Sequence, residues 1–245
     1  MTTASAPVPT EPRADGHAVV LSGEGRFADP WHPFADTSAR LSEIVQAAGF
    51  DVEIAGPDDR MADLDDARLV VVNIGAPSAG DPERDAAARR GLLGYLRRGA
   101  PLLVMHVSST SLPTMPEWED ILGGLWVRGT TMHPDYGLSR ICVYPQRHPI
   151  VARVGDFDLY DERYSYLRVA ADLVPLATHW HDGIEHPLLW ARTYAAPANG
   201  PSSDTAPARV VYNALGHDGR SYDSPVHREI LARAVRWLVG DPQLS

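Results

Sequence analysis

The 245-residue sequence contains no lysine, because all 22 of its basic residues are arginine. This absence excludes a P-loop lysine that binds phosphate, a lysine that forms a Schiff base and a serine–lysine dyad. We attribute the absence to genomic base composition rather than to selection for function. The exclusions hold under either explanation.

Cysteine is almost absent as well, since Cys142 is the single one in the sequence. One cysteine forms no intramolecular disulfide and no multi-cysteine metal site, which fits a reducing cytoplasm. It lies in the apolar run ICVY, where a cysteine usually packs as a small buried side chain. We therefore expect a cytoplasmic protein in which this thiol has no catalytic role.

Long apolar runs and excess positive charge are also missing. No stretch approaches the ~20 apolar residues that span a bilayer, and residues 1–16 lack the basic and apolar regions of a signal peptide. We interpret residues 1–16 as a disordered tail. The net charge of −10 argues against nucleic acid and acidic membranes as partners. The glycine-rich dinucleotide fingerprint is absent too, so we expect no nucleotide cofactor.

Apolar strands alternate with amphipathic helices in the first half of the chain. Strands are predicted at residues 17–21, 51–54 and 68–73, and helices at residues 35–49 and 82–98. This repeated βαβ order is typical of an α/β fold in three layers, with a doubly wound, mostly parallel sheet. One domain over residues 17–245 is sufficient for this length, although two are not excluded.

The pattern loosens after residue 110. A short helix is predicted at residues 115–122 and a closing helix at residues 225–239, with strands at residues 139–144, 164–169, 173–178, 187–193 and 209–215. The segment at residues 195–208 is poor in bulky apolar residues, so we predict a flexible loop there.

The stretch PLLVMHVSST at residues 101–110 is the central feature of the sequence. It reads as a buried strand that ends in His106 and turns into small hydroxyl residues. His32 and His217 occupy the loops after the first and last strands. Because the carboxyl ends of parallel strands meet at one edge of a sheet, the three histidines are predicted to converge there.

Six motifs follow one another in a specific order: SGEGRFADPWHPFADTSARLSEIVQAAGFDVE, PLLVMHVSS, RHPIV, YDERYSYL, PLLWARTY and RVVYNALGHD. Together with a closing helix that ends in RWLVG, they resemble the trehalose-utilisation (ThuA-like) family of the class I glutamine amidotransferase-like superfamily. The resemblance extends over residues 17–240. It implies a flavodoxin-like three-layer fold and a link to sugar metabolism, in particular to keto-sugars and keto-glycosides.

The resemblance also implies candidate site residues. His106 matches the histidine that ends the family's central strand, Glu162 matches an acidic residue of its Asp-Glu-Leu-Tyr-like segment, and His217 matches its Gly-His motif. Arg163 replaces the usual apolar residue after the glutamate, and His32 resembles a polar residue of the first loop. The superfamily's amidotransferases carry a cysteine nucleophile where this chain has His106. We therefore expect no glutaminase activity.

Two kinds of chemistry suit these side chains. His106, Glu162 and His217 form a sound ligand set for one Zn²⁺ or Mn²⁺, with a position left for water or a sugar hydroxyl. Alternatively, the same groups carry out acid–base catalysis without a metal, in which a histidine transfers protons and Glu162 orients it. Both suit isomerisation, elimination or hydrolysis of a sugar or keto-glycoside. We favour the metal.

Two hypotheses for function remain open at this stage. The first is an enzyme of carbohydrate metabolism that uses His32, His106, Glu162 and His217, and the second is a catalytically inactive sugar-binding or interaction domain. Titratable groups at strand ends favour the enzyme. The expected partners are a small carbohydrate and, in addition, a second copy of the chain in a homodimer. Candidate substrate-binding residues are Ser22, Trp31, Ser108, Trp126, His181 and Tyr222.

Overall fold

The computed structural model describes residues 16–197 and 206–244. The predicted tail, apart from residue 16, and the middle of the predicted loop at residues 195–208 lie outside the described residues. The strands are β1 (His17–Ser22), β2 (Asp51–Ala55), β3 (Leu69–Asn73), β4 (Leu102–Met105), β5 (Gly124–Leu125), β6 (Gly137–Val143), β7 (Phe157–Asp161), β8 (Arg168–Val169), β9 (Pro175–His181), β10 (Ile184–Tyr194) and β11 (Ala208–Asn213).

The helices cover both faces of the sheet. They are α1 (Phe34–Ala47), α2 (Pro57–Arg60), α3 (Pro82–Arg97), α4 (Trp118–Leu122), α5 (Gly219–Tyr222) and α6 (Pro225–Leu238), with 3₁₀ turns η1 (Gly25–Phe27), η2 (His106–Thr110), η3 (Pro149–Val151) and η4 (Pro242–Leu244). None of the helices in the described ranges is both long enough and apolar enough to cross a membrane.

One large sheet organises the described residues. Its nine strands follow the order β2-β1-β3-β4-β11-β10-β9-β6-β7. The five strands from β2 to β11 are parallel, whereas β10, β9, β6 and β7 each pair antiparallel with their neighbours. The carboxyl ends of β1, β4 and β11 consequently meet at one edge, as the sequence predicted.

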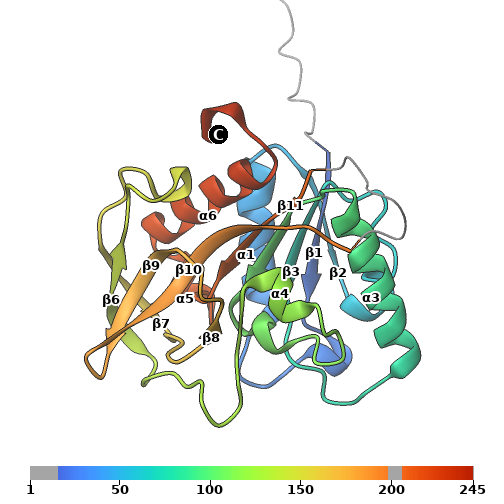
Figure 1. Cartoon of the computed structure of the whole chain (residues 1–245), viewed down its shortest axis with the longest axis horizontal. Coiled ribbons are helices and arrows are strands. Elements are labelled where there is room, and N and C mark those ends of the chain that lie inside the picture. Colours follow the sequence, from blue (N-terminus) through green and yellow to red (C-terminus); the bar gives the residue numbers. More distant parts are fainter. Residues whose placement is uncertain (1–15, 198–205, 245) are drawn as a thin grey trace, which may run out of the picture.

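The predicted three-layer α/β fold is confirmed. Helices α1 and α6 pack against each other on one face of the sheet, while α3 and α4 lie on the other (Figure 1). The apolar side chains of β3 and β4 are fully buried between these layers. Burial on both faces explains why these strands read as continuous apolar runs rather than as alternating ones.

Local signals place the helices close to their predicted positions. Asp81 and Ser224 accept hydrogen bonds from the first turns of α3 and α6, and a proline follows each of them. Gly49 and Gly99 adopt φ of 98° and 72° just after α1 and α3. Glycine adopts this left-handed region without the steric cost that a Cβ imposes, so it ends both helices.

The second half departs from the prediction in two places. The strand expected at residues 164–169 is reduced to β8 at its end, because the chain there turns at Tyr166 with φ of 59°. Instead, the preceding residues form β7, which the sequence analysis missed. In β7, Phe157, Leu159 and Asp161 are buried, which is an alternating pattern typical of a strand with one buried face. Because Asp161 is one of the three inward-facing residues, the apolar alternation is incomplete and the sequence did not indicate a strand.

Two glycines of α3 provide a matched pair for a stability test. A Cβ on Gly91 would clash with the carbonyl oxygen of Met61, whereas a Cβ on Gly94 would meet nothing within 4 Å. We predict that Gly91→Ala lowers the free energy of unfolding by about 1–3 kcal/mol through overpacking. Gly94→Ala should instead raise it by about 0.5–1 kcal/mol, because alanine favours the helix. Urea denaturation measures both, and equal effects would contradict the close packing of α3 on residues 61–62.

Candidate functional site

Three histidines and one glutamate converge at the carboxyl edge of the sheet. His32 lies in the loop before α1, His106 directly follows β4, and His217 lies in the loop after β11. Glu162 directly follows β7. One side-chain nitrogen or oxygen of each residue lies within 4.8 Å of those of the other three. The predicted convergence is therefore present in the structure, with His32 as a full member.

Hydrogen bonds fix the orientation of two of these imidazoles. His32 Nδ1 lies 2.8 Å from Asp29, and His106 Nδ1 lies 2.7 Å from the carbonyl oxygen of Ala214. Carboxylate and carbonyl oxygens only accept hydrogen bonds, so each Nδ1 carries the proton and each Nε2 presents a lone pair. Both Nε2 atoms are buried and make no hydrogen bond to the described residues. This arrangement matches metal-binding histidines, whose second nitrogen is usually held by an acceptor.

Glu162 lies between two of the histidines. Its Oε2 is 3.2 Å from His217 Nδ1 and 3.4 Å from His106 Nε2, and its Oε1 is 3.6 Å from His133 Nε2. Burial alone would raise the pKa of Glu162, but His106 and His217 hold it well below its ordinary value. Glu162 is therefore a carboxylate at neutral pH.

The imidazoles differ in their protonation. Burial, reinforced by His106, lowers the pKa of His32 to about 4, although Asp29 acts in the opposite direction. Burial likewise lowers the pKa of His106. For His217, burial lowers the pKa but the neighbouring Glu162 outweighs it, so the pKa is raised. At least two imidazoles are thus neutral at pH 7, which is the form that binds metals.

His106 is held in an unusual backbone conformation. Its φ is 43°, in the left-handed region that non-glycine residues seldom adopt. The Tyr212 hydroxyl donates to its carbonyl oxygen at 2.8 Å, and the Tyr164 ring stacks on its imidazole at 4.4 Å. Such strained positions often occur at functional sites, where the surroundings enforce them. Here the left-handed backbone directs the His106 imidazole toward His32, Glu162 and His217.

Asp161 connects Glu162 to the loop that carries His217. Its carboxylate accepts hydrogen bonds from the backbone of Gly216 at 2.7 Å and of His217 at 3.1 Å, and from the Ser221 hydroxyl at 2.7 Å. Asp161 is almost completely buried. The sequence analysis did not select this residue, because its role depends on contacts with residues more than fifty positions away.

A cavity of about 750 Å³ reaches the cluster, and two of the four residues, His32 and Glu162, line it. Glu162, His32 and the fully buried Tyr164 form part of its wall, and the largely exposed Trp31 lies at its rim. The sequence analysis missed His133, which also lines the cavity. No apolar strand precedes His133, so the reasoning that found the other histidines gave no signal for it.

The predicted substrate-binding residues divide into two groups. Trp31 and Trp126 line the cavity, and their role in binding stays a prediction. Ser22 is buried and accepts a hydrogen bond from Ser38 at 2.8 Å. The hydroxyl of Ser108, also buried, contacts the backbone at Val72 and Ile74.

Tyr222 and His181 also do not line this cavity. Tyr222 is fully buried and packs beneath Gly216. His181 lies at the end of β9 beside Asp182 and is not among the residues that line the cavity. Ser22, Ser108 and Tyr222 are therefore buried outside the residues that line the cavity, and the two serine hydroxyls bond to the protein's own groups. His181 is outside the site as well.

Comparison with known proteins identifies the family. A family model named ThuA and described as trehalose utilisation matches residues 18–238. The chain belongs to the ThuA family. Membership supports a role related to carbohydrate utilisation. A search among curated proteins gave no match.

Solved structures agree on the fold of this ThuA protein. A ThuA-like protein from Parabacteroides merdae is similar with a TM-score of 0.73 and 18% identity, over 92% of this chain and 90% of that one. Another from Bacteroides uniformis has a TM-score of 0.70 and 14% identity, over 97% and 96% of the two chains. A glutamine amidotransferase from Thermotoga maritima has a TM-score of 0.53 and 8% identity, over 92% and 99%. These likenesses show the amidotransferase-like fold.

Asp161 provides a test of how the ThuA site is held together. Replacing it by asparagine puts an amide donor against groups that already donate, so Asp161→Asn should lower the free energy of unfolding by about 1–3 kcal/mol. Asp158→Asn, on the same strand but exposed and paired with Arg140 at 3.4 Å, should change it by less than about 1 kcal/mol. Chemical denaturation of both variants checks this, and equal losses would argue against the bridging role.

Proposed function

We propose that this ThuA protein is a metal-dependent enzyme that acts on a keto-sugar or keto-glycoside. One observation carries the proposal. His32 Nε2, His106 Nε2 and His217 Nδ1 are buried, make no hydrogen bond to the described residues, and lie with the Glu162 carboxylate within 4.8 Å of one another. The family's link to carbohydrate utilisation supports the substrate class.

A single divalent cation fits this cluster better than an arrangement of protein groups alone. His32 Nε2 is buried without a partner among the described residues, which costs about 1–3 kcal/mol, while His106 Nε2 and His217 Nδ1 face the Glu162 carboxylate. One cation would satisfy all three nitrogens and the carboxylate. Ligands ~2.1 Å from one ion lie at most ~4.2 Å apart, so only small side-chain shifts are needed for the four groups to bind together. Imidazole and carboxylate ligands suit Zn²⁺ and Mn²⁺.

The side chains around the cluster indicate which reaction a metal bound there would support. A bound divalent ion supplies Lewis acidity that polarises a carbonyl oxygen. Trp31 and Trp126 offer aromatic faces on which a sugar ring stacks. Arg128 and His133 provide polar contacts from the cavity wall. This combination suits proton removal beside a sugar ketone, which leads to isomerisation or to elimination of a glycosidic substituent.

The contact between His217 and Glu162 favours a second candidate, acid–base chemistry without a metal. The raised pKa of His217 and the lowered pKa of Glu162 describe an ion pair that holds a proton near the cavity. In that case His217 would donate the proton and Glu162 would orient it. Metal analysis separates the two candidates.

Metal content is the first prediction from this proposal. Protein purified without chelator should contain about one divalent ion per chain, because three imidazoles and one carboxylate bind such an ion, and a five- or six-coordinate ion keeps a further position for substrate. His106→Ala and Glu162→Ala should each lose it, as measured by inductively coupled plasma mass spectrometry. His181→Ala is the matched control, since this histidine lies outside the cluster, and should keep the ion. Metal-free wild-type protein that also fails to bind added Zn²⁺ or Mn²⁺ would contradict the proposal.

Dependence of turnover on the ion is the second prediction. Wild-type protein should convert at least one member of a panel of 3-keto-glycosides, lose this activity after treatment with chelator, and regain it with Zn²⁺ or Mn²⁺. Product analysis by NMR distinguishes isomerisation, elimination and hydrolysis. Activity that survives complete metal removal would instead support the acid–base candidate.

A further inference from the structure

A second cavity adjoins the cavity at the four-residue cluster. It has a volume of about 460 Å³ and shares five lining residues with the first. We propose that it receives an aromatic aglycone, so that the substrates are aryl glycosides rather than disaccharides. This inference rests on the proposed function, because it assigns the reacting sugar to the first cavity. The shared residues are Ala76, Pro77, Thr110, Trp126 and Arg128.

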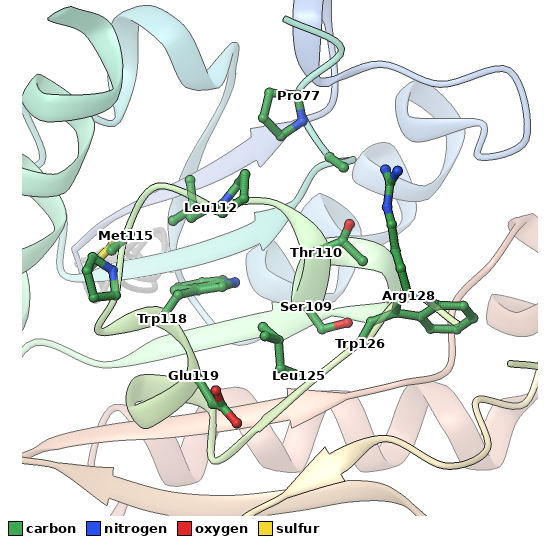
Figure 2. Close-up of a pocket in the computed structure, with 13 residues that line it drawn as sticks. Pro77, Ser109, Thr110, Leu112, Met115, Trp118, Glu119, Leu125, Trp126 and Arg128 are labelled. Atoms are coloured by element: carbon green, nitrogen blue, oxygen red, sulfur yellow. The ribbon is translucent and has the colours of Figure 1, made fainter. Parts of the chain in front are cut away.

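The shared residues place the two cavities side by side along one cleft. Figure 2 shows Met115 at one end of the second cavity and Trp126 with Arg128 at the other. Trp126 also contacts Tyr164 and His133 of the first cavity, with ring centroids 4.6 Å and 6.3 Å apart. A ligand longer than one sugar ring therefore extends from the cluster past Trp126 into the second cavity.

The polar side chains that line the second cavity already have partners. The Ser109 and Thr110 hydroxyls contact the carbonyl oxygens of His106 and Val107 at 3.5 Å and 2.8 Å, respectively. The indole N–H of Trp118 donates to the carbonyl oxygen of Ser108 at 3.0 Å.

The one carboxylate among the lining residues is likewise engaged. Glu119 accepts two hydrogen bonds of 2.6 Å from the guanidinium of Arg168. Apart from Arg128 at the shared edge, the side-chain donors described here are used within the protein, so only acceptor lone pairs of Ser109, Thr110 and Glu119 remain for the hydroxyls of a second sugar. Moving sugar hydroxyls out of water without new partners is unfavourable. The cavity therefore selects against a second sugar ring.

The remaining lining favours a flat apolar group. Leu112, Met115, Leu125 and Trp118 surround the cavity (Figure 2). Aromatic rings pack well against leucine and indole, and a methionine sulfur adds a favourable contact with a ring edge. The volume lies within the ordinary range for small-molecule sites, and exceeds what a methyl group fills.

The test compares three ligands that share one reacting sugar. They are the 3-keto derivatives of phenyl α-glucoside, methyl α-glucoside and trehalose, titrated by calorimetry into the metal-loaded full chain at low temperature. We expect the phenyl compound to bind about tenfold or more tightly than the methyl compound, because burial of an aromatic ring supplies this gain. The trehalose derivative should bind no more tightly than the methyl compound.

A large side chain that fills the second cavity should weaken binding of the phenyl compound but not of the methyl compound. Leu125→Trp is expected to reduce the advantage of the phenyl compound to about twofold, while the affinity for the methyl compound stays unchanged. Val174→Trp adds the same side chain at an exposed position and should keep the full advantage. If the Leu125 variant does not fold, the comparison of ligands on the wild-type protein decides alone.

The outcomes separate this inference from the proposed function. Equal affinities for the phenyl and methyl compounds, or tightest binding of the trehalose derivative, would overturn the aryl-glycoside assignment even if binding depends on the metal. A phenyl preference combined with turnover that survives complete metal removal would support the assignment and count against the metal-dependent function. Failure of all three compounds to bind would overturn both.

Discussion

The carboxylate of Asp161 accepts three hydrogen bonds from the loop between Gly216 and Ser221, and the position of Glu162 depends on this connection. In the order of the sheet, β7 and β11 are separated by three strands. Without the buried carboxylate, nothing in the strand order would bring the residue after β7 to the residue after β11. Burial raises the pKa of Asp161 although four groups donate to it, the fourth being the backbone N–H of Glu162, so the stability that this carboxylate contributes depends on these donors remaining in place.

Hydrogen bonds also orient two of the imidazoles. Asp29 and the carbonyl oxygen of Ala214 each engage one nitrogen of a histidine, which leaves the other nitrogen directed at a common centre. Burial lowers the pKa of His32 and of His106 and keeps both imidazoles neutral, whereas His106 and His217 hold the pKa of Glu162 low and keep it ionised. The site therefore combines two neutral imidazoles with the Glu162 carboxylate, and Asp29 lies behind His32. This is an environment that attracts a cation more strongly than it attracts an anion.

The sequence predicted the features that depend on local patterns. Buried strands, helix ends and the convergence of His32, His106 and His217 follow from apolar runs, capping residues and the common edge of parallel strands. Glu162 was found only through family resemblance, because β7 reads as an irregular polar segment. The hydroxyls of Ser108 and Tyr222 look like binding groups in the sequence, yet packing buries them. Asp161 and His133 depend on contacts between distant segments, which no local pattern encodes.

The left-handed turn at His106 has a consequence for how this fold diversifies. The backbone there is fixed by β4, by the hydrogen bond from Tyr212 and by the following 3₁₀ turn, none of which requires an imidazole at position 106. In the amidotransferase-like superfamily that the sequence resembles, the corresponding turn presents a cysteine. Exchange of one side chain on an unchanged turn would therefore convert a site for covalent catalysis into one for coordination chemistry.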